Sequence, residues 1–258
     1  LMMSLFSQKN HIAVQDVSAG ETNYLPTAEN AVQKLAQLHE NLYPQLMNHG
    51  IDLHPPKKHN IVVFESASTS TKRGLIALQY MRTHSQAVRI ERLMGRDETS
   101  NSGIESRRHP VVEVRLTPSY LTLELILSPY AWWDQQNFVG KLTIDRYRKS
   151  FFGLLKKLGG ETKIGYWRGI ELDEMHVTVD QLHRQHIWDE WIGTFDPGKD
   201  WFRVGMWYEP ESEAISEKNI VNELVTQFRG LYTLYTDMIW SSDNNYREFY
   251  NASGSGRY

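Results

Sequence analysis

The stretch VVEVRLTPSYLTLELIL, residues 111–127, decides the fold. Apolar and polar side chains alternate on both sides of a central Thr-Pro-Ser turn, which predicts two antiparallel strands joined as a hairpin. One face of this hairpin is apolar, and the other carries Glu113, Arg115, Thr122 and Glu124. We therefore expect a sheet that packs one face on a core and exposes the other face to water.

Short runs of apolar and β-branched residues predict further strands on both sides of the hairpin. Most of these runs follow one another across polar turns rather than alternating with helices, so a largely antiparallel sheet is expected. The predicted strands cover residues 61–65, 75–81, 87–93, 163–170, 174–179 and 201–208.

Amphipathic helices are predicted where apolar residues recur at steps of three and four. These helices should begin at Thr27, at Thr143, near residue 180 and at Ser216, with Thr and Ser capping the first turns. Pro44 should kink or split the first helix, because proline lacks the N–H that the helix needs. The whole pattern predicts an α+β fold: a largely antiparallel sheet with helices packed mainly on one face, and a long amphipathic C-terminal helix.

The length of 258 residues is near the upper limit for a single hydrophobic core. Residues 1–26 are polar and weakly periodic, so we expect an N-terminal arm there. Residues 27–250 should form a single α+β domain or two intimately packed halves. Residues 251–258, rich in Ser and Gly, should be a flexible tail.

The chain contains no cysteine. Disulfides, thiolate zinc sites and cysteine nucleophiles are therefore excluded, and a reducing compartment is favoured. The N-terminal residues lack the pattern of a signal peptide, and no apolar run is long enough to cross a bilayer. We expect a cytoplasmic protein that has no membrane partner.

Metal and cofactor motifs are weak. His176, His183 and His186 lie close together in the sequence, but their spacing lacks the matched third ligand of a zinc site. There is no glycine-rich phosphate loop and no Gly-x-Ser-x-Gly elbow. The sequence therefore predicts no metal and no cofactor.

The net charge of −3 hides an asymmetry along the chain. Residues 57–168 hold 19 Lys and Arg against 10 Asp and Glu, whereas residues 169–250 hold 6 against 16. One interpretation is that the two blocks neutralise each other within the fold. The other is that the basic block contacts an anionic partner while the acidic block faces water.

The preferred hypothesis is a binding or regulatory module whose residues 57–168 contact an anionic polymer, plausibly nucleic acid, through its phosphates. The candidate contacts are Lys72, Arg73, Arg107 and Arg108, because both pairs sit in predicted loops from which side chains reach outward. Trp207 shares a strand face with Arg203 and could stack on a base, although burial in a core or interface is the simpler interpretation.

An enzyme of unassigned class, with a hydrolase- or nuclease-like pocket on the polar sheet face, is the alternative. Its candidate catalytic residues are Glu113, Glu124 and His176. The nuclease pattern is incomplete, because Arg115 stands where a lysine is commonly found and arginine stays protonated. Cross-strand ion pairs on a solvated sheet explain these charges more simply. A third hypothesis is a protein–protein module, in which the basic and acidic blocks of neighbouring chains meet in a homo-oligomer.

Overall fold

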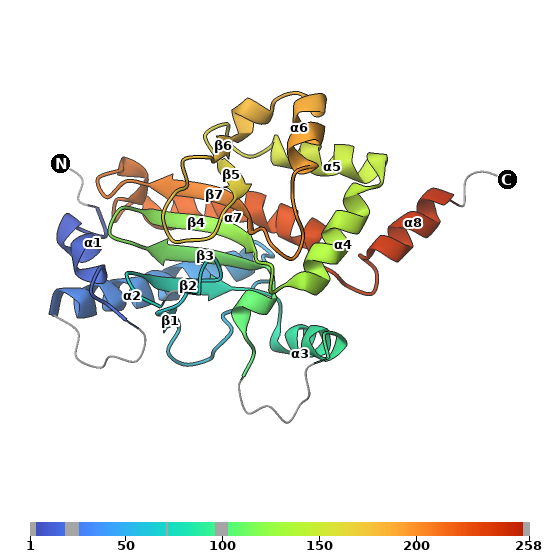
Figure 1. Cartoon of the computed structure of the whole chain (residues 1–258). Helices are drawn as coiled ribbons and strands as arrows, with labels where there is room; N and C mark the ends of the chain where they lie inside the picture. The colour runs from blue at the N-terminus through green and yellow to red at the C-terminus, as the bar shows by residue number, and fades with distance from the viewer. Residues whose placement is uncertain (1–3, 19–25, 71, 96–102, 255–258) are drawn as a thin grey trace.

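One antiparallel sheet organises the chain (Figure 1). The computed structural model describes residues 4–18, 26–70, 72–95 and 103–254. Within these ranges seven strands pair in the order β1-β2-β3-β4-β7-β5-β6. The strands are β1 (Val62–Val63), β2 (Ile76–Tyr80), β3 (Val111–Leu116), β4 (Leu121–Leu127), β5 (Lys163–Tyr166), β6 (Val177–Thr178) and β7 (Phe202–Tyr208).

The predicted central hairpin is confirmed. β3 and β4 pair with Val114 opposite Leu123 and Glu113 opposite Glu124, and the turn between them closes through a hydrogen bond from Thr117 N to Tyr120 O. β2 pairs with the free edge of β3 and β7 with that of β4, both antiparallel. The hairpin is therefore the middle of the sheet, and its alternation sets the two faces.

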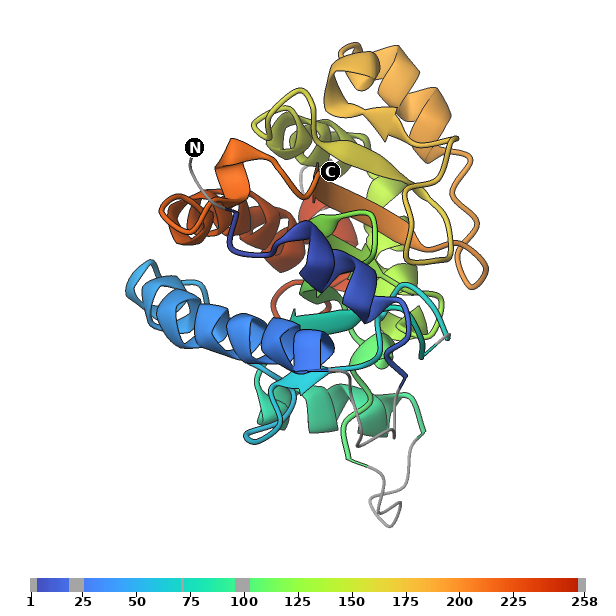
Figure 2. The same ribbon diagram turned by 90° about the vertical axis from the view of Figure 1, so that its left-hand side faces the viewer.

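Most helices cover one face of the sheet (Figure 2). The two longest, α2 and α7, lie side by side there, and the apolar strand positions pack against them. This is the predicted α+β arrangement. The helices are α1 (Gln8–Val14), α2 (Pro26–Asn48), α3 (His84–Leu93), α4 (Trp132–Leu142), α5 (Asp145–Leu155), α6 (Gln185–Ile192), α7 (Ile220–Met238) and α8 (Tyr246–Gly254).

The long C-terminal helix α7 has the predicted apolar stripe. Its buried residues include Leu224 and Phe228, both 0% exposed, and the ring of Phe228 lies edge-on to Tyr80 of β2. The predicted cap is wrong. The helix begins after Asn219, and Ser216 contributes its carbonyl, not its hydroxyl, to the N–H groups of Asn219 and Ile220.

The second face of the sheet is buried, contrary to the expectation that it meets water. Glu113, Arg115 and Glu124 are each 0% exposed. Two loops, residues 64–70 and 167–170, lie over these strands and hydrogen-bond to each other from Gly169 N to Ser68 O. The strand alternation is correct, but covering loops exclude water from the polar face.

Two small apolar clusters flank the polar centre of this covered face. One contains Ala67, Met81, Ala87, Val111 and Ile126, which closes the end of the sheet beneath α3. The other joins β1 and β2 to the covering loop through Val63, Leu75, Ala77 and Ile170. The charged centre is therefore sealed on both sides.

Residues 87–93, predicted as a strand, belong to helix α3. Thr83 caps this helix, with its hydroxyl accepting from Gln86 N and the Gln86 side chain accepting from Thr83 N. This reciprocal capping box ends the preceding extended segment. The run of apolar and β-branched residues that suggested a strand belongs to this helix, in which Ala87 and Ile90 face the core at helical spacing.

Three further sequence predictions need correction. The N-terminal residues, expected to be irregular, contain α1, which is capped by Ser7 and followed by buried Val17. α2 is not split but continues through Pro44. α5 begins after Ile144 with no side-chain cap, so Thr143 does not cap it.

The C-terminal residues and the helix lengths complete the description. α8 extends to Gly254, into the predicted tail, and residues 255–258 lie outside the described residues. Among the ranges that the structure describes, no helix is both long and apolar enough to cross a bilayer.

Candidate functional site

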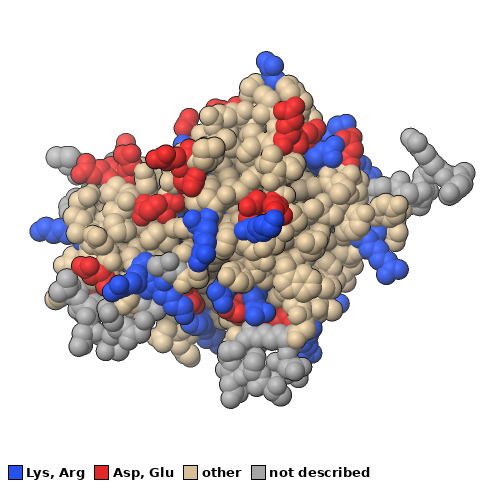
Figure 3. Space-filling view, in the orientation of Figure 1, with Lys and Arg blue, Asp and Glu red and all other residues tan. Residues whose placement is uncertain are grey.

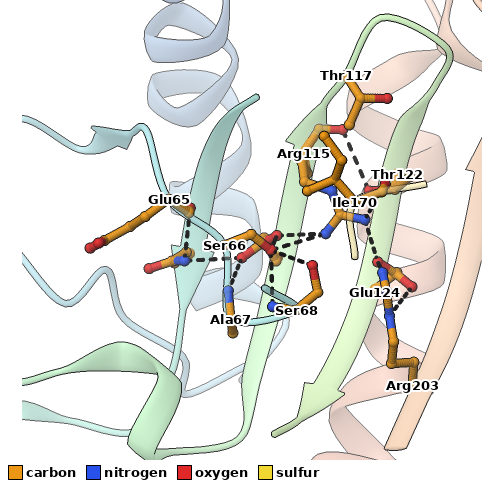
Figure 4. Close-up of polar contacts among 12 residues, drawn as sticks. Glu65, Ser66, Ala67, Ser68, Arg115, Thr117, Thr122, Glu124, Ile170 and Arg203 are labelled. Carbon is orange, nitrogen blue, oxygen red and sulfur yellow. Dashed lines mark hydrogen bonds and ion pairs between the residues drawn. The ribbon is translucent and has the colours of Figure 1, made fainter. Parts of the chain in front are cut away.

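A buried ion-pair network occupies the covered face of the sheet (Figure 4). Arg115 of β3 lies between two carboxylates, with Nη1 2.7 Å from Glu113 Oε1 and Nη2 2.7 Å from Glu124 Oε2. Adjacent strands supply all three side chains, because residues 113, 115 and 124 share one face of the hairpin. The predicted cross-strand ion pair is therefore present, but in a water-free setting.

Arg203 of β7 extends the network to a fourth charge. Its Nε and Nη2 lie 3.1 and 2.6 Å from the two oxygens of Glu124, and Nη1 lies 2.8 Å from Gly169 O of the covering loop. The guanidinium also lies over the Trp167 ring, 4.3 Å from its centre. Two arginines and two glutamates are therefore buried together with no net charge.

Gly205 makes room for this arrangement. It lies opposite Glu124 in the β4–β7 pair, and a Cβ at this position would lie 2.2 Å from Leu123 O and 2.7 Å from Glu124 Cα. Only glycine permits this approach of the two backbones. Trp207, two residues on, lies beneath both Arg115 and Arg203, 5.5 and 5.6 Å from their guanidinium carbons.

Residues 66–68 attach the first covering loop to the network. Glu113 accepts hydrogen bonds from Ser66 Oγ at 2.5 Å, from Ala67 N at 3.1 Å and from Gln79 Nε2 at 3.0 Å. Ser66 and Ser68 also share a hydroxyl hydrogen bond of 2.8 Å. The loop 64–70, which precedes Lys72 in the sequence, is thus held by a carboxylate of the central strand.

The two neighbouring guanidinium groups keep the carboxylate of Glu124 ionised. Burial alone would raise the pKa of Glu124, but the guanidinium groups of Arg203 and Arg115 outweigh it and lower that pKa. Glu113 binds the first covering loop directly, whereas Glu124 binds Arg115 and Arg203, which donate to Ile170 O and Gly169 O of the second loop. His176, the third catalytic candidate, is half-buried, and its Nδ1 contacts Asp173 O rather than either carboxylate.

The predicted loop cations meet at the surface above this network. Lys72 and Arg107 line one small polar cavity of about 90 Å³, together with Ser66, Thr69, Ser70, Ser106, Glu65 and Glu105. Arg73 is exposed beside Lys72, and its backbone bridges to Ser18. The fold therefore brings together two loops that lie more than thirty residues apart in the sequence.

Local carboxylates partly balance these cations. Lys72 lies 3.6 Å from Glu65, while Arg107 and Arg108 both pair with Glu105 at 2.5 and 2.6 Å. Burial would raise the pKa of Glu105, but hydrogen bonds from Arg108 and Arg107 lower it. All these partners belong to the basic block itself, so within the described residues the acidic block 169–250 does not neutralise Lys72, Arg107 or Arg108.

A row of exposed or partly exposed guanidinium and aromatic groups continues from Arg107, and we call it the arginine–aromatic surface. The Arg107 guanidinium lies 4.5 Å from the Tyr130 ring centre, the Tyr130 ring lies edge-on to Trp201 at 6.4 Å, and Arg168 lies 5.6 Å from Trp201. Tyr130 is 43% exposed. Arg168 also donates a hydrogen bond to Ser70, next to the cavity.

Sequence reasoning missed Tyr130, Trp201 and Arg168 as candidates. These residues are distant in the chain and meet through tertiary packing, in which Trp201 Nε1 donates to Ala67 O of the covering loop at 3.1 Å. The composition of the sequence could have indicated Arg168, because this residue belongs to the basic block 57–168. No local sequence motif marked Tyr130 or Trp201 as a candidate.

The space-filling view agrees with a regional charge separation (Figure 3). Lys and Arg side chains spread across the lower middle of this face, whereas Asp and Glu side chains are frequent in its upper left. In the described part of the chain, no group of three or more His, Asp or Glu side chains could hold a metal ion.

Comparison with known proteins gives no further guide. The sequence matches no protein-family model, and no curated protein is similar to it.

Proposed function

We propose that this chain is a binding module for an anionic polymer, and that the polymer is single-stranded nucleic acid held on the arginine–aromatic surface. The observation that supports this most is the row in which two arginines, Arg107 and Arg168, flank two aromatic rings, the exposed Tyr130 and the partly buried Trp201. Proteins that bind single strands combine cations for the backbone with aromatic rings for the bases.

The charge at this surface favours an anion. Lys72, Arg73, Arg107, Arg108 and Arg168 contribute five positive charges, whereas the carboxylates paired with them are Glu65 and Glu105. Surface ion pairs of this kind are weak in water. Phosphates can therefore compete for these cations and release their counterions.

Exposed aromatic rings distinguish a single strand from a duplex. In a duplex the bases are stacked and their faces are hidden, whereas a single strand offers a face to a ring such as Tyr130. Stacking on one aromatic residue contributes about 1–3 kcal/mol per base. We therefore expect a preference for single strands with little dependence on base sequence.

The geometry supports the enzyme alternative less. Glu113 and Glu124 are 0% exposed and ion-paired, and His176 does not join them. A general base has to reach the proton that it removes.

The test is fluorescence anisotropy with a labelled oligothymidine and with a duplex of equal length. We expect tighter binding of the single strand, and weaker binding by Tyr130→Ala with recovery in Tyr130→Phe, because the phenyl ring alone can stack. Tyr250→Ala is the matched control, since Tyr250 is 61% exposed on α8. The proposal is wrong if neither nucleic acid associates at about 20 mM salt, where charge contacts are strongest.

A further inference from the structure

A second cavity lies between α3 and the segment that follows α7, and we call it the α3 cavity. Its volume is about 200 Å³. It is separate from the arginine–aromatic surface and shares no residue with it. It is lined on one side by Arg82, Gln86, Arg89 and Ile90, and on the other by Ile239, Trp240 and residues 241–243.

Arg82 is an unusual residue to line a cavity, because its side chain is only 2% exposed. Its Nη2 lies 2.5 Å from Asp134 Oδ1, which also accepts a hydrogen bond from Trp240 N at 2.7 Å. Asp134 therefore fixes both walls of the cavity relative to each other. The side chain of Tyr235 binds the backbone of the same arginine, because Arg82 N donates to the Tyr235 hydroxyl at 2.8 Å.

The buried guanidinium of Arg82 keeps one donor unused. Its Nε has no hydrogen-bond partner among the described residues. A buried donor without a partner is costly. Arg82 therefore places a cationic group with an incomplete set of hydrogen bonds in the wall of the cavity.

The remaining wall residues define the chemistry of the cavity. Arg89 lies over the Trp240 ring, 5.8 Å from its centre, and has no carboxylate partner within the described ranges. Arg82 is already balanced by Asp134, so Arg89 supplies the positive charge that is not in an ion pair, and Asp243 supplies a negative charge to the same lining. Ile90, Ile239 and the Trp240 ring provide an apolar wall beside these donors.

We propose that the α3 cavity binds a small carboxylate with a flat apolar body. The carboxylate oxygens would accept hydrogen bonds from Arg82 and Arg89, and the apolar body would lie against Trp240. The volume is sufficient, because a cavity of about 150 Å³ holds a benzene ring. Asp243 at the rim, which accepts from Ser241 Oγ at 2.7 Å, opposes the ligand's charge and limits its affinity.

Benzoate is the probe, and benzamide is its neutral counterpart of the same shape. The readout is the indole N–H resonance of Trp240, assigned by its loss in Trp240→Phe. We expect benzoate to shift this resonance with a Kd on the order of 1 mM or lower. Benzamide should bind at least about tenfold more weakly, since it lacks the charge that guanidinium groups recognise.

Variants of exposed residues avoid the folding defect that a change at Arg82 would cause. Arg89→Gln should weaken benzoate binding at least about fivefold, and Asp243→Asn should strengthen it, because a like charge is removed. Arg146→Gln, a change of an exposed arginine on α5, should have no effect. Absence of a shift at about 20 mM benzoate, equal binding of benzamide, or unchanged binding by Arg89→Gln would each overturn the proposal.

Discussion

Arg203 donates two hydrogen bonds to Glu124 across the β4–β7 pair, with Nε 3.1 Å from Oε1 and Nη2 2.6 Å from Oε2. Both side chains are fully buried. The pair links the sheet to the second covering loop, because Arg203 also donates to Gly169 O of that loop. A bidentate pair of this kind fixes direction as well as distance.

Removal of one partner should be severe. Glu124→Gln leaves Arg115 and Arg203 in a buried site with only Glu113, so we expect a loss of about 3–5 kcal/mol in the free energy of unfolding. The double change Glu124→Leu with Arg203→Leu should cost less than the sum of Glu124→Leu and Arg203→Leu, because Arg203 and Glu124 leave together and Arg115 keeps Glu113 as its partner. Urea denaturation of the two single leucine variants and the double variant measures this coupling. Additive losses would show that the pair is not energetically coupled.

Buried histidines should make the fold sensitive to mild acid. Burial lowers the pKa of His11, His39 and His109 below the ordinary value of 6.5, although hydrogen bonds or nearby carboxylates partly oppose this. The folded state keeps these rings neutral, whereas the unfolded chain takes up protons as the pH falls through 6.5. The stability present above that pH is therefore lost below it.

The measurement is the urea midpoint at about pH 7.5 and about pH 5.5. We expect a lower midpoint at the acidic pH and a smaller difference in His109→Gln, which cannot titrate. His109 is the best test, since it is 0% exposed. Equal midpoints at the two pH values would contradict this account.

Truncation of the α7 stripe should destabilise the protein strongly. Leu224→Ala and Phe228→Ala remove fully buried side chains, and each should cost about 2–5 kcal/mol because the neighbouring residues cannot fill the space. Arg229→Ala on the exposed side of the same helix should change stability by less than about 0.5 kcal/mol. Thermal or urea unfolding distinguishes these cases, and near-parental stability of both core variants would mean that α7 does not pack as described.

The periodicity of apolar residues in the sequence was sufficient to predict those parts of the fold that a local pattern determines. The 111–127 hairpin and the apolar stripe of α7 each repeat over several turns or strand residues, and both were predicted. Residues 87–93 were too short for this signal, because a short apolar run does not distinguish a strand from a segment of a helix. The capping box of Thr83 and Gln86 was the better guide to the helix.

The candidate site depended on contacts that no local pattern contains. Alternation correctly placed Glu113, Arg115 and Glu124 on one face, but it could not indicate that loops 64–70 and 167–170 cover that face. The loop cations were identified from charge. Their aromatic partners were not, because Tyr130 and Trp201 approach Arg107 and Arg168 only through tertiary packing.

The helix cap of α3 offers a smaller and more local prediction. Thr83→Ala removes the acceptor for Gln86 N and should cost about 1 kcal/mol, whereas Thr83→Ser retains the hydroxyl and should cost little. Denaturation midpoints compare the two variants. A loss in Thr83→Ser as large as that in Thr83→Ala would assign the effect to the missing methyl group instead of the cap.

The last prediction uses salt to separate charge contacts from structure in the proposed nucleic-acid site. Each phosphate neutralised on a single strand contributes about −0.7 to the slope of log K against log salt concentration. The double changes Lys72→Ala with Arg73→Ala, and Arg107→Ala with Arg108→Ala, should each reduce the slope by up to about 1.4. These residues are exposed or half-exposed, so the unfolding free energy should change little.

Glu105→Gln should act in the opposite direction. The lowered pKa of Glu105 keeps its carboxylate ionised at neutral pH, where it competes with phosphate for Arg107 and Arg108. We therefore expect Glu105→Gln to tighten binding several-fold at low salt, while Glu217→Gln, which alters an exposed carboxylate outside the basic block, leaves it unchanged. If the local carboxylates instead satisfy these cations completely, the parent protein will not associate with nucleic acid at low salt, and the double changes will lower stability through loss of their ion pairs.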